Sequence, residues 1–140
     1  MVSSLEPAKL AKIVVPMFAE ERNDEHHLRN GARSRLVVGV DAQDDCAAYA
    51  LSGDQVLVFG SDYVRGPKFS LYERGYLTNY DIGWYLAGAN LSDVAAMGAQ
   101  PIGLLSVIRY PKDREDSEFR AILEGVRDCC ASVGAANVGG

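Results

Sequence analysis

The chain has 140 residues, of which 48% are apolar and 24% are charged, and its formal net charge is -5. This length suits one compact domain, and the apolar fraction is too high for a disordered chain. The sequence contains no run of about 18 apolar residues, which argues against a membrane span, and its acidic balance without a Lys/Arg cluster argues against nucleic acid as a main partner.

The cysteines and the N-terminus indicate a cytoplasmic protein. The three cysteines are odd in number, and Cys129 and Cys130 are adjacent, which is typical of buried free thiols in a reducing compartment. The first residues lack the basic region, apolar stretch and cleavage site of a secretory signal. Paired Cys/His spacings of a zinc site are also missing from the sequence.

Residues 1–35 predict a helix followed by a polar linker. Ser3-Ser4 supplies a capping hydroxyl, and Pro7 falls in the first turn of the expected helix. The apolar residues that follow recur at helical spacing: Leu10, Ile13, Val14 and Met17. Residues 20–34 are polar, and we expect them to form a loop.

Residues 36–140 predict a domain of the α/β (α+β) class. The apolar run 36–40 predicts a strand, and runs 47–51 and 55–59 flank a Ser-Gly-Asp turn and predict a hairpin. A loop rich in Gly and Pro is expected to extend from residue 60 to about residue 80.

Two helices alternate with two strands in the remainder of the chain. A helix is expected over Asp81–Met97 with Gly98 at its C-terminal cap, and a second is expected from Phe119 to Val133 with Gly134 at its cap. Residues 102–108 predict a buried strand, and residues 135–138 begin another. The sequence ends on Gly139-Gly140 directly after that strand, and we expect a truncation before a further domain.

Acidic residues at the ends of elements are the candidates for chemistry. Asp44 and Asp45 lie between the first strand and the hairpin, and Asp62 follows a strand directly. At about 100° per residue, Asp93 falls about 20° from Ile82 around the helix axis, on an apolar stripe. A carboxylate in such a position must be paired, neutralised or bound to a metal. Separated carboxylates are typical ligands of Mg²⁺.

Structural roles also explain these carboxylates. Asp44 and Asp45 could form a plain turn, Asp62 could cap a strand end, and Asp93 could bond a backbone amide. Neither Gly-rich phosphate-loop pattern is present, and both histidines lie in the polar linker, which argues against a Ser/His/Asp triad. The residues alone therefore indicate an acidic site for a metal and a phosphate as one of several alternatives.

The segment 90–101, Asn-Leu-Ser-Asp-Val-Ala-Ala-Met-Gly-Ala-Gln-Pro, resembles the signature of thiamine-monophosphate kinases. These enzymes belong to one superfamily with aminoimidazole ribonucleotide synthetase, selenophosphate synthetase and a hydrogenase maturation protein. Three further stretches resemble the family's motifs in the same order: Asp44-Asp45-Cys46-Ala47, Ser61-Asp62 followed by Gly66-Pro67-Lys68-Phe69, and Gly139-Gly140. The resemblance covers roughly residues 36–140, the family's N-terminal domain.

The resemblance implies a mixed sheet flanked by helices that pairs with a second copy into a barrel across a homodimer. It implies that ATP and Mg²⁺ bind in this domain and that the γ-phosphoryl group passes to a small phosphorylated substrate, thiamine phosphate in the kinases. Carried over by position, the implied magnesium ligands are Asp45, Ser61, Asp62 and Asp93. Gly140 would touch nucleotide phosphate, and Lys68 would contact the substrate.

Departures from the family pattern bear on the substrate. The stretch from Gly39 to Asp45 has two extra residues and one glycine fewer than the family motif, and the loop after Asp62 is one residue shorter. Lys68 stands where the thiamine kinases carry a histidine, and a lysine meets phosphate as a point charge only. Two alternatives to a kinase therefore stay open: an ATP-dependent synthetase of the aminoimidazole ribonucleotide type, and a non-catalytic module for nucleotide binding or dimerisation.

Overall fold

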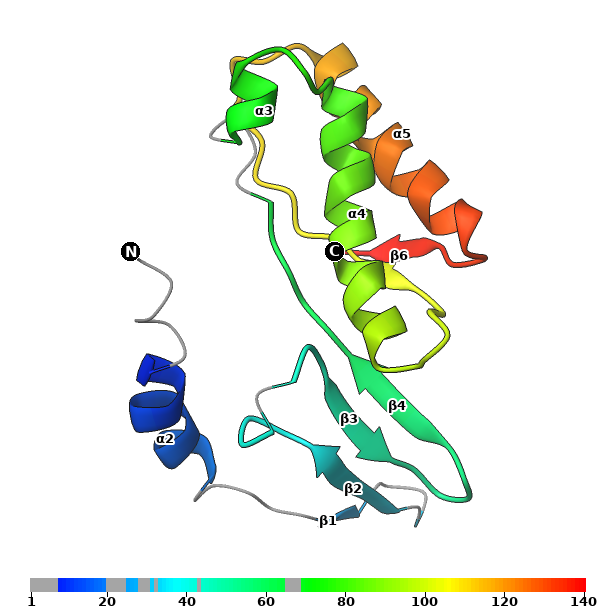
Figure 1. Ribbon diagram of the computed structural model, residues 1–140. Coiled ribbons are helices and arrows are strands. Elements are labelled where there is room, and N and C mark those ends of the chain that lie inside the picture. The colour runs from blue at the N-terminus through cyan, green and yellow to red at the C-terminus, as the bar shows by residue number, and fades with distance from the viewer. Residues whose placement is uncertain (1–7, 20–24, 28–30, 32, 43, 65–68) are drawn as a thin grey trace. The chain divides into compact units, whose positions relative to one another are not determined.

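The computed structural model (Figure 1) describes residues 8–19, 25–27, 31, 33–42, 44–64 and 69–140. The chain divides into two compact units, Met1–Gly60 and Ser61–Gly140, and each is described by itself. Both units contain helices and strands, which confirms the mixed α and β class. The boundary between residues 35 and 36 stays a prediction.

The first unit begins with a helical segment. A π-helical turn, η1 (Leu10–Val14), continues directly into α2 (Val15–Ala19), which confirms the helix predicted from the apolar spacing. The predicted cap at Ser3-Ser4 and Pro7 lies outside the described residues. Several apolar side chains of this helix are exposed: Leu10, Ile13, Met17 and Phe18.

A four-stranded antiparallel sheet completes the first unit. Its strands lie in the order β1 (Glu25–His27), β2 (Arg33–Val38), β3 (Ala47–Ala50) and β4 (Val56–Phe59). Ala47 pairs with Phe59 and Ala50 with Val56, so the predicted hairpin is confirmed.

Two sequence expectations in this unit are wrong at their boundaries. Residues 25–27, expected in a loop, form β1 and pair with residues 33–35 of β2. Pairing uses backbone groups that every residue has, so a strand formed by polar residues gives no apolar signal. The strand expected at 36–40 begins at Arg33 and ends at Val38, after an irregularity in register.

The second unit contains two long helices and a parallel pair of strands. Its elements in order are α3 (Ser70–Glu73), α4 (Asn79–Ala96), β5 (Leu104–Leu105), α5 (Asp116–Ser132) and β6 (Asn137–Gly139). The crossover through α5 makes β5 and β6 parallel, as connections of this kind do. The described strands thus form an antiparallel sheet and a parallel pair, so the antiparallel and parallel pairings of the expected mixed sheet occur in two separate sheets.

The predicted strand at 102–108 is shorter and less buried than expected. Only Leu104 and Leu105 are assigned to β5, and Leu104 is buried while Ile102, Leu105 and Val107 are exposed. The reason is local: Leu104 packs into a cluster with α4 and α5, whereas the exposed side chains of the run are not packed against that cluster. A continuous apolar run therefore does not establish burial on both faces.

Both long helices end as the glycines predicted. Gly98 and Gly134 have φ values of 68° and 74°, and the Ala99 and Ala135 N–H groups reach back to Val94 O and Cys130 O. These bonds form the Schellman motif that satisfies the last carbonyls of a helix.

The start of α4 depends on a reciprocal cap. Thr78 and Asp81 exchange side-chain and backbone hydrogen bonds, so the helix begins two residues earlier than expected. The hydrogen bond that the Thr78 backbone N–H donates lowers the pKa of the Asp81 carboxyl.

Helices α4 and α5 lie side by side (Figure 1) and share the core of the second unit. A Cβ atom on Gly83 would overlap with the Ile122 carbonyl oxygen, and one on Gly125 would overlap with the Tyr80 carbonyl oxygen. The two backbones are therefore in direct contact, which only glycine permits at these positions.

The core holds the two adjacent thiols of α5. Cys129 and Cys130 are free and buried, as is Cys46 in the first unit, which confirms the expectation of buried free thiols. Burial raises the pKa of both the Cys129 and the Cys130 thiol.

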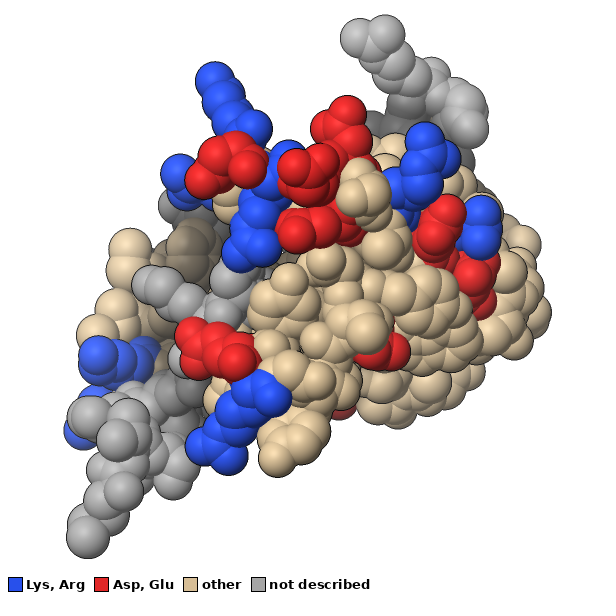
Figure 2. Space-filling view, turned by 90° about the horizontal axis from the view of Figure 1, so that it is seen from above, with Lys and Arg blue, Asp and Glu red and all other residues tan. Residues whose placement is uncertain are grey.

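The described surface mixes charges of both signs. Figure 2 shows acidic and basic side chains interspersed on the face in view, and two ion pairs are formed in and beside α5, Arg114–Glu118 at 3.2 Å and Arg127–Asp128 at 2.7 Å. Among the helices in the described part of the chain, none combines the length and the apolarity that a membrane crossing requires.

Candidate functional site

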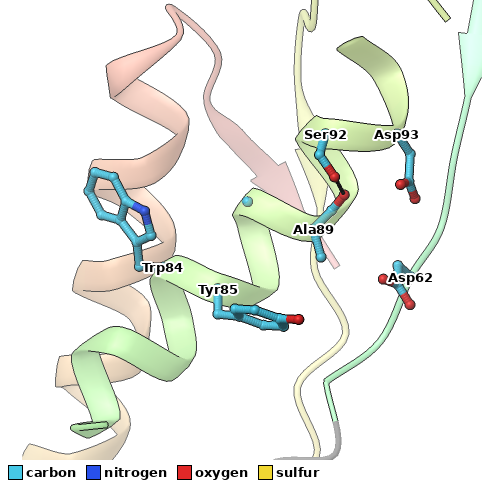
Figure 3. A pocket seen from close by; sticks show the side chains of 7 residues that line it. Asp62, Trp84, Tyr85, Ala89, Ser92 and Asp93 are labelled. Carbon is cyan, nitrogen blue, oxygen red and sulfur yellow. Dashed lines mark hydrogen bonds between the residues drawn. The ribbon is translucent and has the colours of Figure 1, made fainter. Parts of the chain in front are cut away.

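An open pocket in the second unit is the candidate site (Figure 3). Its lining comes from the segment after β4 and from one side of α4: Asp62, Trp84, Tyr85, Gly88, Ala89, Ser92 and Asp93. Its volume of about 460 Å³ lies in the range of small-molecule sites. Two of the predicted site residues, Asp62 and Asp93, therefore line one pocket.

The Asp62 backbone is held by a side chain of α4. The Asp62 N–H donates to Asn90 Oδ1 at 2.7 Å, and Asn90 Nδ2 donates to the Asp62 carbonyl oxygen at 3.4 Å. The Asp62 carboxylate in turn accepts from the Tyr63 N–H at 2.6 Å. Both backbone groups of Asp62 and one carboxylate oxygen thus have a fixed partner.

Asp93 lies about one turn beyond Asn90 in α4, and it is half-buried. The prediction that it shares a stripe with Ile82, Leu86 and Ala89 is confirmed, since Ile82 is buried and the other two are half-buried. The side of α4 that packs against α5, however, is a different one, formed by Gly83, Ala87 and Leu91. Two of these three residues, Gly83 and Ala87, are small, so the pattern of large apolar residues did not reveal this side of the helix.

The two carboxylates provide the chemistry that Mg²⁺ requires. In Figure 3 the Asp93 side chain extends from α4 toward the segment that carries Asp62. Mg²⁺ takes hard oxygen ligands and is usually held by one or two carboxylates together with phosphate and water. Within the described ranges, no group of three His, Cys, Asp or Glu side chains could hold a metal. The donor set fits an ion that is held partly by a phosphate ligand.

The other predicted site residues lie elsewhere. Asp45 is exposed in the first unit, and its N–H donates to Asp44 Oδ1 at 2.9 Å. Ser61 is exposed and directly precedes Asp62. Lys68 lies outside the described residues.

Gly140 occupies a position that excludes a side chain. Its φ is 135°, and a Cβ atom there would overlap with the Ser106 carbonyl oxygen. The Ser106 N–H donates to Gly139 O at 2.8 Å, which continues the pairing of β5 with β6. A backbone without side chains is what close approach of a phosphate requires.

Six lining or supporting residues were not predicted as site residues from the sequence: Trp84, Tyr85, Gly88, Ala89, Asn90 and Ser92. Asn90 is the supporting one, and Trp84 and Tyr85 add aromatic surface to the pocket. Tyr85 also contacts the Phe69 ring, with centroids 5.2 Å apart. A signal for Asn90 was present, because asparagine in a helix interior competes with the backbone and needs a reason to be there.

Comparison with known proteins confirms the resemblance found in the sequence. The family model described as "AIR synthase related protein, N-terminal domain" matches residues 43–140. No solved structure matches the chain.

Curated relatives fall into two kinds. The thiamine-monophosphate kinase of Synechococcus elongatus is 38% identical over 98 residues, which are 69% of this chain and 29% of the relative. The selenide, water dikinase of Carboxydothermus hydrogenoformans is 29% identical over 138 residues, 99% of this chain and 35% of the relative. A thiamine-monophosphate kinase of Halobacterium salinarum is 44% identical over 63 residues, 45% of this chain and 22% of the relative. The chain thus spans about a third or less of the length of these relatives.

Proposed function

The chain belongs to the family of AIR synthase related proteins, through their N-terminal domain, and on that premise we propose that it is the nucleotide- and magnesium-binding part of a phosphotransferase that uses ATP. The single observation that carries this proposal is the pocket that Asp62 and Asp93 both line. The preferred reaction is transfer of a phosphoryl group to a small phosphorylated metabolite, as in a thiamine-phosphate kinase.

The proposed roles are those that the family resemblance implies, and the chemistry of each residue agrees with them. Asp62 and Asp93 hold the ion, with Asp45 and Ser61 as further oxygen ligands, and the backbone at Gly140 approaches the nucleotide phosphates. Mg²⁺ supplies neutralisation of the charge on the transferred phosphoryl group. Phosphoryl transfer depends on positioning and electrostatics and requires no covalent intermediate on the protein. Lys68 is proposed to contact the phosphate of the acceptor.

A second acceptor, the selenide in the name of the dikinase relatives, is supported by how much of this chain those relatives match. The selenide, water dikinase of C. hydrogenoformans matches 99% of the chain, whereas the S. elongatus kinase matches 69%.

Product analysis distinguishes a kinase from the synthetase and the non-catalytic alternatives. A kinase leaves its phosphoryl group on an isolable product, a synthetase of the aminoimidazole ribonucleotide type releases inorganic phosphate, and a non-catalytic module binds nucleotide without turnover.

Asp62→Asn and Asp45→Asn test the proposed metal site. Each removes one anionic ligand, so each is expected to weaken magnesium-dependent ATP binding about tenfold or more, a loss of about 1.4 kcal/mol or more. Calorimetric titration with ATP, with and without Mg²⁺, measures the effect. The exposed turn residue Asp54 offers a matched control, since Asp54→Asn changes the net charge equally and should bind as wild type. Wild-type binding by both test variants would contradict the assignment.

We further propose that two copies associate through the sheet of the first unit. Strand β4 pairs with β3 alone among the described strands, and its Val56 and Phe59 side chains are 57% and 48% exposed. An apolar edge strand of this kind invites pairing with another chain, which agrees with the barrel that the family resemblance implies.

Val56→Lys is therefore expected to convert a dimer into a monomer. A charge on an edge strand opposes pairing between copies. Light scattering at about 50 μM protein, a concentration at which a micromolar dimer is largely formed, measures the mass. Val133→Lys, at an exposed position in the second unit, should leave the mass unchanged. A monomeric wild type would contradict the proposal.

A further inference from the structure

We propose that Asn90 is a positioning residue that fixes the backbone of Asp62 beside the turn of α4 that carries Asp93. The inference rests on the proposed role of Asp62 and Asp93 in metal binding, but its geometry is independent of any ion.

The Asn90 amide bonds both the N–H and the carbonyl oxygen of Asp62, as the backbone of a neighbouring β-strand would. Its oxygen accepts the Asp62 N–H at 2.7 Å, and its nitrogen lies 3.4 Å from the Asp62 carbonyl oxygen. The same nitrogen donates to the Leu86 carbonyl oxygen at 2.9 Å, within α4. One side chain thus connects the helix to a segment 28 residues away in the sequence.

The contacts of Asn90 explain why asparagine, which is unfavourable in a helix interior, occurs at this position of α4. Asparagine destabilises a helix interior relative to alanine because its side chain competes for backbone groups. Here the amide nitrogen does bond the helix backbone at Leu86, while the amide oxygen leaves the helix to accept from the Asp62 N–H. Aspartate lacks the donor for the two carbonyl oxygens, and serine has a single polar atom. The asparagine amide offers a donor atom and a separate acceptor atom to the Asp62 backbone.

The consequence concerns two like charges. Asp62 and Asp93 line the same pocket, and carboxylates that share a site repel each other. Asn90 lies three residues before Asp93, on the adjacent turn of α4, so its bonds to Asp62 oppose that repulsion directly. The backbone that carries the Asp62 carboxylate is therefore fixed beside the turn that carries Asp93 before an ion arrives, and residues that orient ligands in this way contribute to metal affinity.

The test uses Asn90→Ala with Asn79→Ala as its matched control. Asn79 is an asparagine of the same helix whose side chain also bonds another element, accepting from the Tyr72 hydroxyl at 2.7 Å. Two measurements are made well below the melting temperature: amide exchange of Asp62 by NMR without metal, and titration of Mg²⁺ in the presence of ATP. Asn90→Ala is expected to abolish protection of the Asp62 amide and to weaken Mg²⁺ binding about 10- to 100-fold. Asn79→Ala should change neither.

The outcomes separate this inference from the proposed function. If Asp62→Asn weakens Mg²⁺ binding while Asn90→Ala binds as wild type, the positioning role is overturned and the metal site stands. If Asp62→Asn binds as wild type, the metal site fails, and the amide exchange still reports whether Asn90 holds Asp62. Should Asn90→Ala not fold, the wild type decides: an Asp62 amide that exchanges as fast as those of the exposed turn Ser52–Asp54 overturns the inference.

Discussion

Gly125→Ala is expected to lower the free energy of unfolding by about 3 kcal/mol, the upper end of the usual range for an overpacked core. A Cβ atom at this position would overlap with the Tyr80 carbonyl oxygen and lie 2.7 Å from the Trp84 backbone nitrogen. Backbone atoms cannot move aside as the end of a side chain can, so α4 and α5 must separate. The separation opens the cluster that contains Ala87, Val126 and Cys130.

Urea unfolding followed by circular dichroism measures the effect, and another glycine of α4 provides the control. A Cβ atom on Gly88 would lie 3.8 Å from Cys129 Sγ, an ordinary contact. Gly88→Ala should therefore keep or raise the stability, because alanine is favoured over glycine in a helix interior by about 1 kcal/mol. Equal stability changes in both variants would contradict the backbone contact. Gly83→Ala, which overlaps with the Ile122 carbonyl oxygen, should behave as Gly125→Ala does.

Asp93→Asn is expected to remove most of the stabilisation that the proposed function assigns to Mg²⁺ and ATP, without lowering the stability of the metal-free chain. If Asp93 and Asp62 share an ion, the metal-free protein holds two like charges at one pocket, and the substitution relieves their repulsion. A ligand present at a hundred times its dissociation constant stabilises the folded state by about 2.7 kcal/mol, so loss of the site is visible as loss of that shift.

Melting curves of both proteins, with and without Mg²⁺ and ATP, measure the two effects together. A residue that serves only the fold would give the opposite pattern. Loss of a charge-assisted hydrogen bond would lower the metal-free stability by about 1–3 kcal/mol and leave the shift on ligand addition intact. That result would contradict a metal-binding role for Asp93.

Much of the fold was predictable because local signals agree with it. The turn at Ser52–Asp54 and its flanking apolar runs specified the β3–β4 hairpin, and Gly98 and Gly134 marked the ends of both long helices. Strand β1 was missed because pairing through backbone groups leaves no trace in a polar sequence. The predicted burial of residues 102–108 was wrong because an apolar run does not determine which of its side chains pack against other elements.

The sequence predicted the two carboxylates of the candidate site but not the residues that hold them in position. Asp62 and Asp93 were identified from their places at a strand end and on a helix stripe, and both line one pocket. Asn90 was missed because its partner is distant in the sequence, so no spacing rule connects the two. The α5-facing side of α4 was missed because Gly83 and Ala87 carry it, and small residues give little apolar signal.

The direct contact between the backbones of α4 and α5 also determines how this unit can respond to a ligand. Sliding motions between helices occur where flexible side chains form the interface and can change rotamer as they pass. At Gly83 and Gly125 no side chain lies between the two backbones, so we expect the two helices to move together as one rigid body. Because Asn90 also bonds the Asp62 backbone to α4, both carboxylates of the pocket are carried by backbone that is tied to this helix pair, and ligand binding requires little rearrangement between them.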